Sequence, residues 1–262
     1  MSFTKAVLLT LLIFIIEAGI VLTSLFVFDS KNAHLHGISV IIARVVAYST
    51  VFILFWRGND QKGIFQFSKL RPVVIPLLLP LIVATEFIFR PFFDYDRILM
   101  LINNQELPNY NYSFQGFTAK QIYSSIAALL VAPIIEELFF RKFLITELLK
   151  KYSISITLLV SSFLFAIIHW ETPVNLLPSF LFGLLSGFIY FKTKNIAYSV
   201  LLHFFANIAS LILTIEGASY HKWLSWLNFG FLYWTFCIID IITFLEILNY
   251  ILLITTRLAQ LY

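Results

Sequence analysis

Long apolar stretches separated by short polar segments form the main pattern along this chain. A transmembrane helix needs about 20 consecutive apolar residues, and eight stretches approach that length. Without a long repeat or a low-complexity linker, the pattern predicts one all-α, polytopic membrane helix bundle over residues 1–262. The expected spans are Ala6–Phe28, Ile38–Trp56, Val73–Phe93, Gln121–Ile145, Ile154–His169, Leu176–Phe191, Ile196–Ile215 and about Phe231–Thr255.

Three segments need a separate interpretation. The first stretch carries Glu17, exceeds the roughly 7–15-residue core of a signal peptide and lacks an A-x-A site, so we expect a retained span. The segment Trp223–Tyr250 fits either one long helix or a short interfacial piece followed by a span. The outer loop 94–118, with breakers at Pro108 and Gly116, is expected to be a solvated connector, a lid or a partner contact.

Composition supports a membrane protein. Hydrophobic residues make up 60% and charged residues 12%, against roughly 45–50% and ~25% in soluble domains. These values exclude a soluble cytoplasmic enzyme and a disordered chain. A single cysteine, Cys237, excludes a disulfide scaffold. We expect no nucleic-acid partner, because the chain has neither a basic tail nor zinc-finger spacing.

The distribution of basic residues predicts the orientation in the membrane. With the N-terminus in the cytoplasm, twelve of the eighteen Lys and Arg residues fall in cytoplasmic segments, four fall outside and two lie within spans. We therefore expect an even number of spans in the cell membrane, with both termini cytoplasmic.

Ionisable residues inside the predicted spans need partners, since each costs roughly 2.5–3.5 kcal/mol on insertion scales. Glu17 and Arg44 occupy mirrored places in the first hairpin and are predicted to pair. Glu86 and Arg90 are four residues apart on one helix and are predicted to pair as well. Asp240 has no evident partner in the sequence, and no role is assigned to it.

The fourth span holds two adjacent carboxylates, Glu136 and Glu137, after Pro133. In a helix they diverge by about 100°, so one side chain cannot easily share the other's task. Glu137 and Arg141 are four residues apart and can pair. We therefore expect Glu137 to point toward Arg141, and Glu136 to face another group.

Two further spans bring polar side chains to a similar depth. Glu136 and His169 fall at mirrored positions about the polar turn Lys150–Ser153, each roughly 24 Å along its helix. His203 and Asn207 share one face of the seventh span. We predict that these four side chains meet in one cavity.

A carboxylate, two imidazoles and a carboxamide are suited to a hydrolase that activates water. A buried glutamate can serve as a general base, and imidazole and amide groups can donate to an oxyanion. One alternative is that these side chains only hold helices together. A second is a zinc site, although the sequence lacks H-E-x-x-H. Cys237 is expected to be an inert buried residue.

Three motifs occur in order on three predicted spans and together resemble the CPBP family of intramembrane proteases. This family includes type II CAAX prenyl endopeptidases and bacterial proteins linked to bacteriocin self-immunity or peptide signalling. The resemblance covers roughly residues 130–211, with a family-like core of about 119–216. The motifs are E-E-x-x-x-R (Glu136, Glu137, Arg141), F-x-x-x-H (Phe165, His169) and H-x-x-x-N (His203, Asn207).

The resemblance implies that Glu136 and His169 activate water without a metal or cofactor. By the same resemblance, His203 and Asn207 stabilise the oxyanion. Lys142 departs from the pattern, since bacterial members often have glycine there. The accessory or structural residues implied by the resemblance are Glu137, Arg141 and Phe165.

The expected function is therefore an intramembrane endopeptidase, in a bacterial membrane by size and composition. Its expected substrate is a short hydrophobic signal peptide, a bacteriocin leader or a membrane-protein segment. The alternative is a non-proteolytic regulatory or bacteriocin-immunity protein that binds a membrane partner. A small transporter is less favoured, because no inverted repeat is evident.

Overall fold

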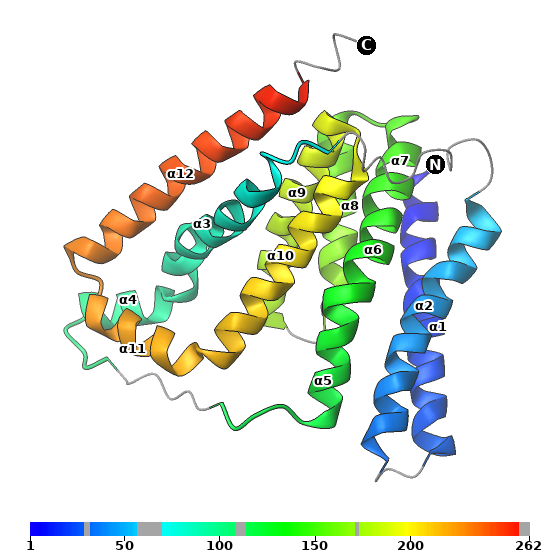
Figure 1. Cartoon of the computed structure of the whole chain (residues 1–262), viewed down its shortest axis with the longest axis horizontal. Helices are drawn as coiled ribbons and strands as arrows, with labels where there is room; N and C mark the ends of the chain where they lie inside the picture. Colours follow the sequence, from blue (N-terminus) through cyan, green and yellow to red (C-terminus); the bar gives the residue numbers. More distant parts are fainter. Residues whose placement is uncertain (29–31, 57–69, 108–113, 171–172, 257–262) are drawn as a thin grey trace. The chain divides into compact units, whose positions relative to one another are not determined.

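A computed structural model describes residues 1–28, 32–56, 70–107, 114–170 and 173–256 (Figure 1). Over these ranges the regular structure is helical and includes no strand, which confirms the predicted all-α class. The α-helices are α1 (Phe3–Val27), α2 (Ala33–Phe55), α3 (Ile75–Phe93), α4 (Tyr95–Ile102), α5 (Ala119–Ile126), α6 (Ala132–Glu137), α7 (Thr146–Leu149), α8 (Ile154–Ile167), α9 (Leu176–Thr193), α10 (Ile196–Ile215), α11 (Gly217–Leu227) and α12 (Phe231–Thr256).

Within the described ranges, seven segments are long and apolar enough to cross a membrane, so the chain is a multi-pass membrane protein. They are α1, α2, α3, Ala119–Leu149, α9, α10 and α12 as far as Ile254. The remaining predicted span, Ile154–His169, forms the 14-residue helix α8. That helix rises about 21 Å, which is shorter than the ~30 Å hydrocarbon core of a bilayer.

Two regions that the pattern left open are now defined. The region Trp223–Tyr250 contains the end of α11 and most of α12, which confirms the interpretation of a short piece followed by a span. The predicted loop 94–118 begins instead with helix α4. Pro108 lies outside the described residues.

The helices belong to two compact units. The first contains Met1–Leu70 and Phe117–Phe204, and the second contains Arg71–Gly116 and Phe205–Tyr262. In the first unit, α1 and α2 lie side by side as a hairpin, and α8 and α9 form another pair (Figure 1). The second unit pairs α3 with α12.

Small residues allow α8 and α9 to approach closely. A Cβ atom at Gly183 would lie 2.9 Å from Cβ of Ser162, and one at Gly187 would lie 3.0 Å from Cδ2 of Leu158. Both glycines are on α9, four residues apart, as in the small-residue motifs that join membrane helices. This packing holds the part of α9 between Gly183 and Gly187 close to α8.

The segment from Ala119 to Leu149 is an interrupted helix. It begins at a capping box, in which Thr118 and Gln121 exchange hydrogen bonds. Wider π-helical stretches, η3 (Ala127–Val131) and η4 (Leu138–Ile145), flank α6. Pro133 lies in the first turn of α6, where its missing N–H does least harm. Near Pro133 the segment therefore consists of two π-helical stretches around a short α-helix.

Aromatic side chains fill the core of the first unit beside this interrupted helix. Phe139 contacts Phe140 edge-on, with 4.9 Å between ring centroids, and Phe140 meets Phe165 in the same way at 5.3 Å. From α2, Tyr48 packs edge-on against Phe139 at 5.8 Å. These contacts fix α2 and α8 against the helix that carries Glu136 and Glu137.

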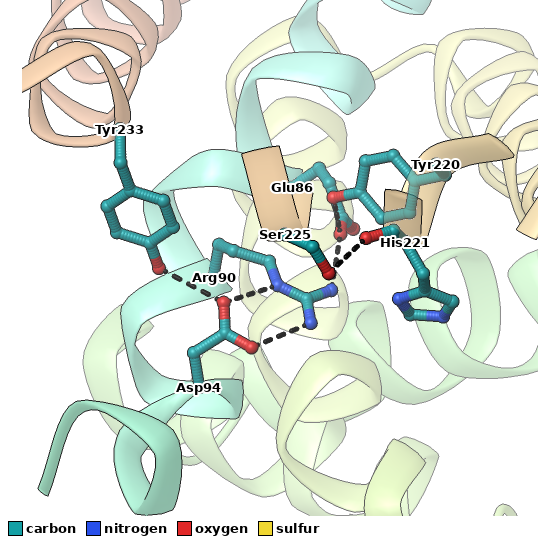
Figure 2. A network of polar contacts seen from close by, with 7 residues as sticks. All are labelled: Glu86, Arg90, Asp94, Tyr220, His221, Ser225 and Tyr233. Atoms are coloured by element: carbon teal, nitrogen blue, oxygen red, sulfur yellow. Dashed lines mark hydrogen bonds and ion pairs between the residues drawn. The ribbon is translucent and has the colours of Figure 1, made fainter. Parts of the chain in front are cut away.

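A polar network joins helices of the second unit (Figure 2). The Nε and Nη2 atoms of Arg90 both donate to Asp94 at 2.8 Å, and Nη1 lies 3.4 Å from Glu86. Tyr220 donates to Glu86 at 2.7 Å, and Tyr233 donates to Asp94 at 3.2 Å. The predicted Glu86–Arg90 pair is thus confirmed, within a larger network that ties α3 to α11 and α12.

Candidate active site

The two adjacent carboxylates on α6 serve different helices of the first unit. Because successive helix residues are about 100° apart, Glu136 contacts α2 while Glu137 contacts α9 and α10. Both side chains are buried. Each therefore needs a charged or hydrogen-bonding partner where it lies.

Glu137 is the centre of a buried network. One of its oxygens, Oε2, lies 3.0 Å from Nε of Arg141 and accepts a hydrogen bond from Oγ of Ser186 at 2.7 Å. The other, Oε1, is 3.0 Å from Nδ1 of His203. The predicted Glu137–Arg141 pair is confirmed. The same carboxylate also contacts His203, a contact that the i,i+4 spacing did not predict.

His203, on α10, is held in one orientation. A carboxylate accepts hydrogen bonds, so Nδ1 of His203 carries the proton in its contact with Glu137. The imidazole lies between two aromatic rings, with centroid distances of 5.7 Å to Phe165 and 5.1 Å to Phe182. This leaves Nε2 as the nitrogen that can act on a bound molecule.

Phe165 links the accessory groups of the site. The guanidinium carbon of Arg141 lies 4.5 Å from the centroid of the Phe165 ring, a cation–π distance. Neither Nη atom of Arg141 finds a hydrogen-bond partner among the described residues. The ring face of Phe165 and the charge of Glu137 together accommodate this buried cation.

Glu136 faces the first hairpin. Its Oε1 atom lies 3.6 Å from Nη1 of Arg44 on α2. Arg44 also donates from Nε to Oε1 of Glu17 at 3.0 Å, which confirms the predicted Glu17–Arg44 pair. The second oxygen of Glu136, Oε2, is buried and has no hydrogen-bond partner in the part of the chain that the structure describes.

His169 follows the end of α8 and has a defined tautomer. Its Nδ1 lies 2.9 Å from the carbonyl oxygen of Phe165. Because a carbonyl only accepts, Nδ1 is the protonated nitrogen and Nε2 is basic. The ring of His169 also lies 5.0 Å from the ring of Phe165, measured between centroids. Both imidazoles therefore pack against Phe165.

Asn207 is the remaining residue that was predicted to face the cavity. Asn207 lies one turn of α10 after His203 and belongs to the second unit, whereas His203 belongs to the first. The part of Asn207 in the site stays a prediction. Ser186 and the second contact of Arg44 were missed by the sequence analysis. Among the described residues, no group of three or more His, Cys, Asp or Glu side chains is placed to hold a metal ion.

Part of this chain is similar to known protein families and proteins. Residues 118–209 match the model of the family described as type II CAAX prenyl endopeptidase Rce1-like. A Bacillus subtilis (strain 168) protein named "Putative membrane peptidase YdiL" is 32% identical over 91 residues. That alignment covers 35% of this chain and 37% of the relative. No solved structure matches the chain.

The residues matched by the family model contain α5 to α9 and the first part of α10. This segment contains all three motifs. Helices α1 and α2, which supply Glu17 and Arg44, lie outside the residues matched by the family model. The two matches confirm that part of this chain resembles the CPBP family of membrane proteases.

Proposed function

We propose that this protein is an intramembrane endopeptidase in which Glu136 activates a water molecule. The observation that carries the proposal is the buried, unpartnered Oε2 atom of Glu136, in the same unit as His169, whose Nε2 is left unprotonated. A buried acceptor without a protein partner is a place where water can bind. A carboxylate and an imidazole acting together on that water can remove its proton.

The reaction follows from these groups. The water oxygen attacks the carbonyl carbon of the scissile peptide bond while Glu136 takes the proton, with His169 as a second acceptor. The negative charge that develops on the carbonyl oxygen requires donors. When the C–N bond breaks, the proton moves from Glu136 to the leaving amine. The products are a carboxylic acid and an amine, and no covalent acyl-enzyme forms.

His203 and Asn207 are the proposed oxyanion donors. Because Nδ1 of His203 already donates to Glu137, Nε2 donates to an oxyanion only when the ring is doubly protonated. The carboxylate of Glu137 would balance the charge of that imidazolium, as the buried aspartate does in serine-protease triads. Glu137, Arg141 and Phe165 then act as the support of His203. The mechanism uses no metal ion.

The proposed substrate is a peptide or membrane-protein segment that reaches the site within the bilayer. A signal peptide or a bacteriocin leader has the hydrophobic character and length that such a site requires. The proposed orientation places both termini in the cytoplasm, as the distribution of Lys and Arg predicts.

Comparative peptidomics tests this function in cells. Membrane and medium fractions are compared between cells carrying wild type, Glu136→Ala and the control Glu246→Ala, which alters an exposed glutamate on α12. Peptides present with wild type and Glu246→Ala but absent with Glu136→Ala are the expected result. Identical peptide sets in all three strains would contradict the proposal and favour a non-proteolytic regulatory or immunity protein.

A further inference from the structure

Arg44 lies outside the segment that matches the protease family, yet it contacts the carboxylate proposed as the general base. Its Nη1 atom is 3.6 Å from Oε1 of Glu136, and its Nε atom is 3.0 Å from Oε1 of Glu17. We propose that Arg44 is a positioning residue for Glu136 and that Glu17 holds Arg44 in place. This inference rests on the proposed function.

Because Glu136 is buried, its charge depends on the contact with Arg44. The side chain of Glu136 is only 3% exposed, so its charge has little access to water. Leaving a buried charge without a partner typically costs several kcal/mol. Among the described residues, Arg44 is the only cation within ion-pair distance of Glu136. Arg141, although it is on the same helix, forms its ion pair with Glu137.

The geometry also separates the two oxygens of Glu136. Oε1 faces Arg44, whereas Oε2 is buried without a partner among the described residues. Fixing one oxygen against a guanidinium limits rotation of the carboxylate. The other oxygen then keeps one direction, which is the condition for a general base that must meet a water within hydrogen-bond distance.

Packing holds α2 at the position that this contact requires. Tyr48 follows Arg44 by one turn of α2, and Phe139 follows Glu136 by three residues. The two rings meet edge-on with centroids 5.8 Å apart, and Tyr48 is 2% exposed. The α1–α2 hairpin is therefore assigned a part in the active site, in addition to its part in the membrane.

The experiment measures kcat and KM of purified protein in detergent micelles, with quenched fluorescent casein as the probe. Arg44→Gln should lower kcat on the order of 10²-fold, as expected for a misplaced catalytic group, and leave KM nearly unchanged. Arg44→Lys should restore most of the loss, because it returns a cation beside Glu136. The double variant Glu17→Gln/Arg44→Gln removes both charges together and should remain folded but slow.

Two controls separate this inference from the proposed function. Glu86→Gln changes a glutamate of the second unit that is also paired with an arginine, and it should retain wild-type kcat. Glu136→Gln should be inactive. If Glu136→Gln is inactive while Arg44→Gln and the double variant keep wild-type kcat, Arg44 has no positioning role and the proposed function stands. If Glu136→Gln is fully active, or wild type does not cleave the probe, the proposed function fails instead.

A thermal double-mutant cycle tests the contact itself without any substrate. The shifts in Tm of Arg44→Gln and Glu136→Gln should not add in the combined variant, because each removes the same interaction. Strictly additive shifts would overturn the proposed contact, even with an inactive preparation.

Discussion

Oε1 of Glu137 lies 3.0 Å from Nδ1 of His203, and the same carboxylate also contacts Arg141 and Ser186. One side chain therefore anchors an imidazole, compensates a buried cation and joins α6 to α9 and α10. This makes Glu137 a structural residue of the site with an indirect effect on the proposed chemistry. Glu136, its neighbour in sequence, has one oxygen left for that chemistry.

Glu137→Gln should strongly destabilise the protein. It removes the ion pair with the fully buried Arg141, and breaking a buried pair typically costs about 3–5 kcal/mol. Thermal unfolding in detergent should show a large fall in Tm. The matched control is Glu147→Gln, which breaks a more exposed pair with Lys150 and should change stability by about 0–1 kcal/mol. Equal shifts for the two variants would argue against the Glu137 network.

Gly183→Ala should disturb the site through the helix packing. Its new Cβ would lie 2.9 Å from Ser162, so α9 must move away from α8 and carry Ser186 with it. Overpacking of this kind costs about 1–3 kcal/mol. At Gly19 on α1, an added Cβ meets nothing within 4 Å, and Gly19→Ala should stabilise the helix by up to ~1 kcal/mol. A harmless Gly183→Ala would contradict the close α8–α9 contact.

The stability of the protein should fall at alkaline pH, in part because of Tyr220. Burial and the nearby charge of Glu86 raise the pKa of the Tyr220 phenol. A group with a raised folded pKa contributes stability that is fully present below its unfolded pKa, near 10, and is lost as pH rises further. Tyr220→Phe should therefore flatten the loss of Tm above about pH 10. An unchanged slope would mean that Tyr220 does not hold its proton in the folded state.

The helix content and most span positions follow directly from the apolar pattern, because hydrocarbon thickness sets the length of a spanning helix. The Glu17–Arg44 and Glu137–Arg141 pairs were also predictable, from mirrored depth and i,i+4 spacing. Sequence spacing did not reveal the contact of Arg44 with Glu136. It depends on how α2 is rotated against α6, and π-helical stretches on both sides of α6 alter the regular 3.6-residue period.

Ser186 illustrates the second limit of the sequence analysis. A serine in an apolar helix ordinarily bonds its own backbone, so it carried no signal by itself. Its position beside Gly187, one turn after Gly183, was the available clue to close packing. The helix α8 is shorter than the other predicted spans, and whether it crosses the membrane stays a prediction. Its apolar stretch continues to Ile168, but the helix ends at Ile167, and a helix of this length spans a bilayer only where the bilayer is thinned.

Topology is the next prediction. Reporter fusions after Lys194 and after Lys62, which lies outside the described residues, should report the cytoplasm. A fusion near Asn104 should report the opposite side. The Lys194 fusion is the decisive one, because its side depends on whether the short helix α8 crosses the bilayer. An outside signal there would overturn the eight-span orientation.

The most direct test of the proposed chemistry is the turnover of purified Glu136→Gln beside wild type, with and without a zinc chelator. The Gln side chain keeps the shape of Glu136 and removes its basicity. We predict that Glu136→Gln loses activity by at least about 10²–10³-fold while it remains folded, and that chelation has no effect on wild type. Full activity of Glu136→Gln, or activity lost on chelation and restored by zinc, would contradict a glutamate-activated water.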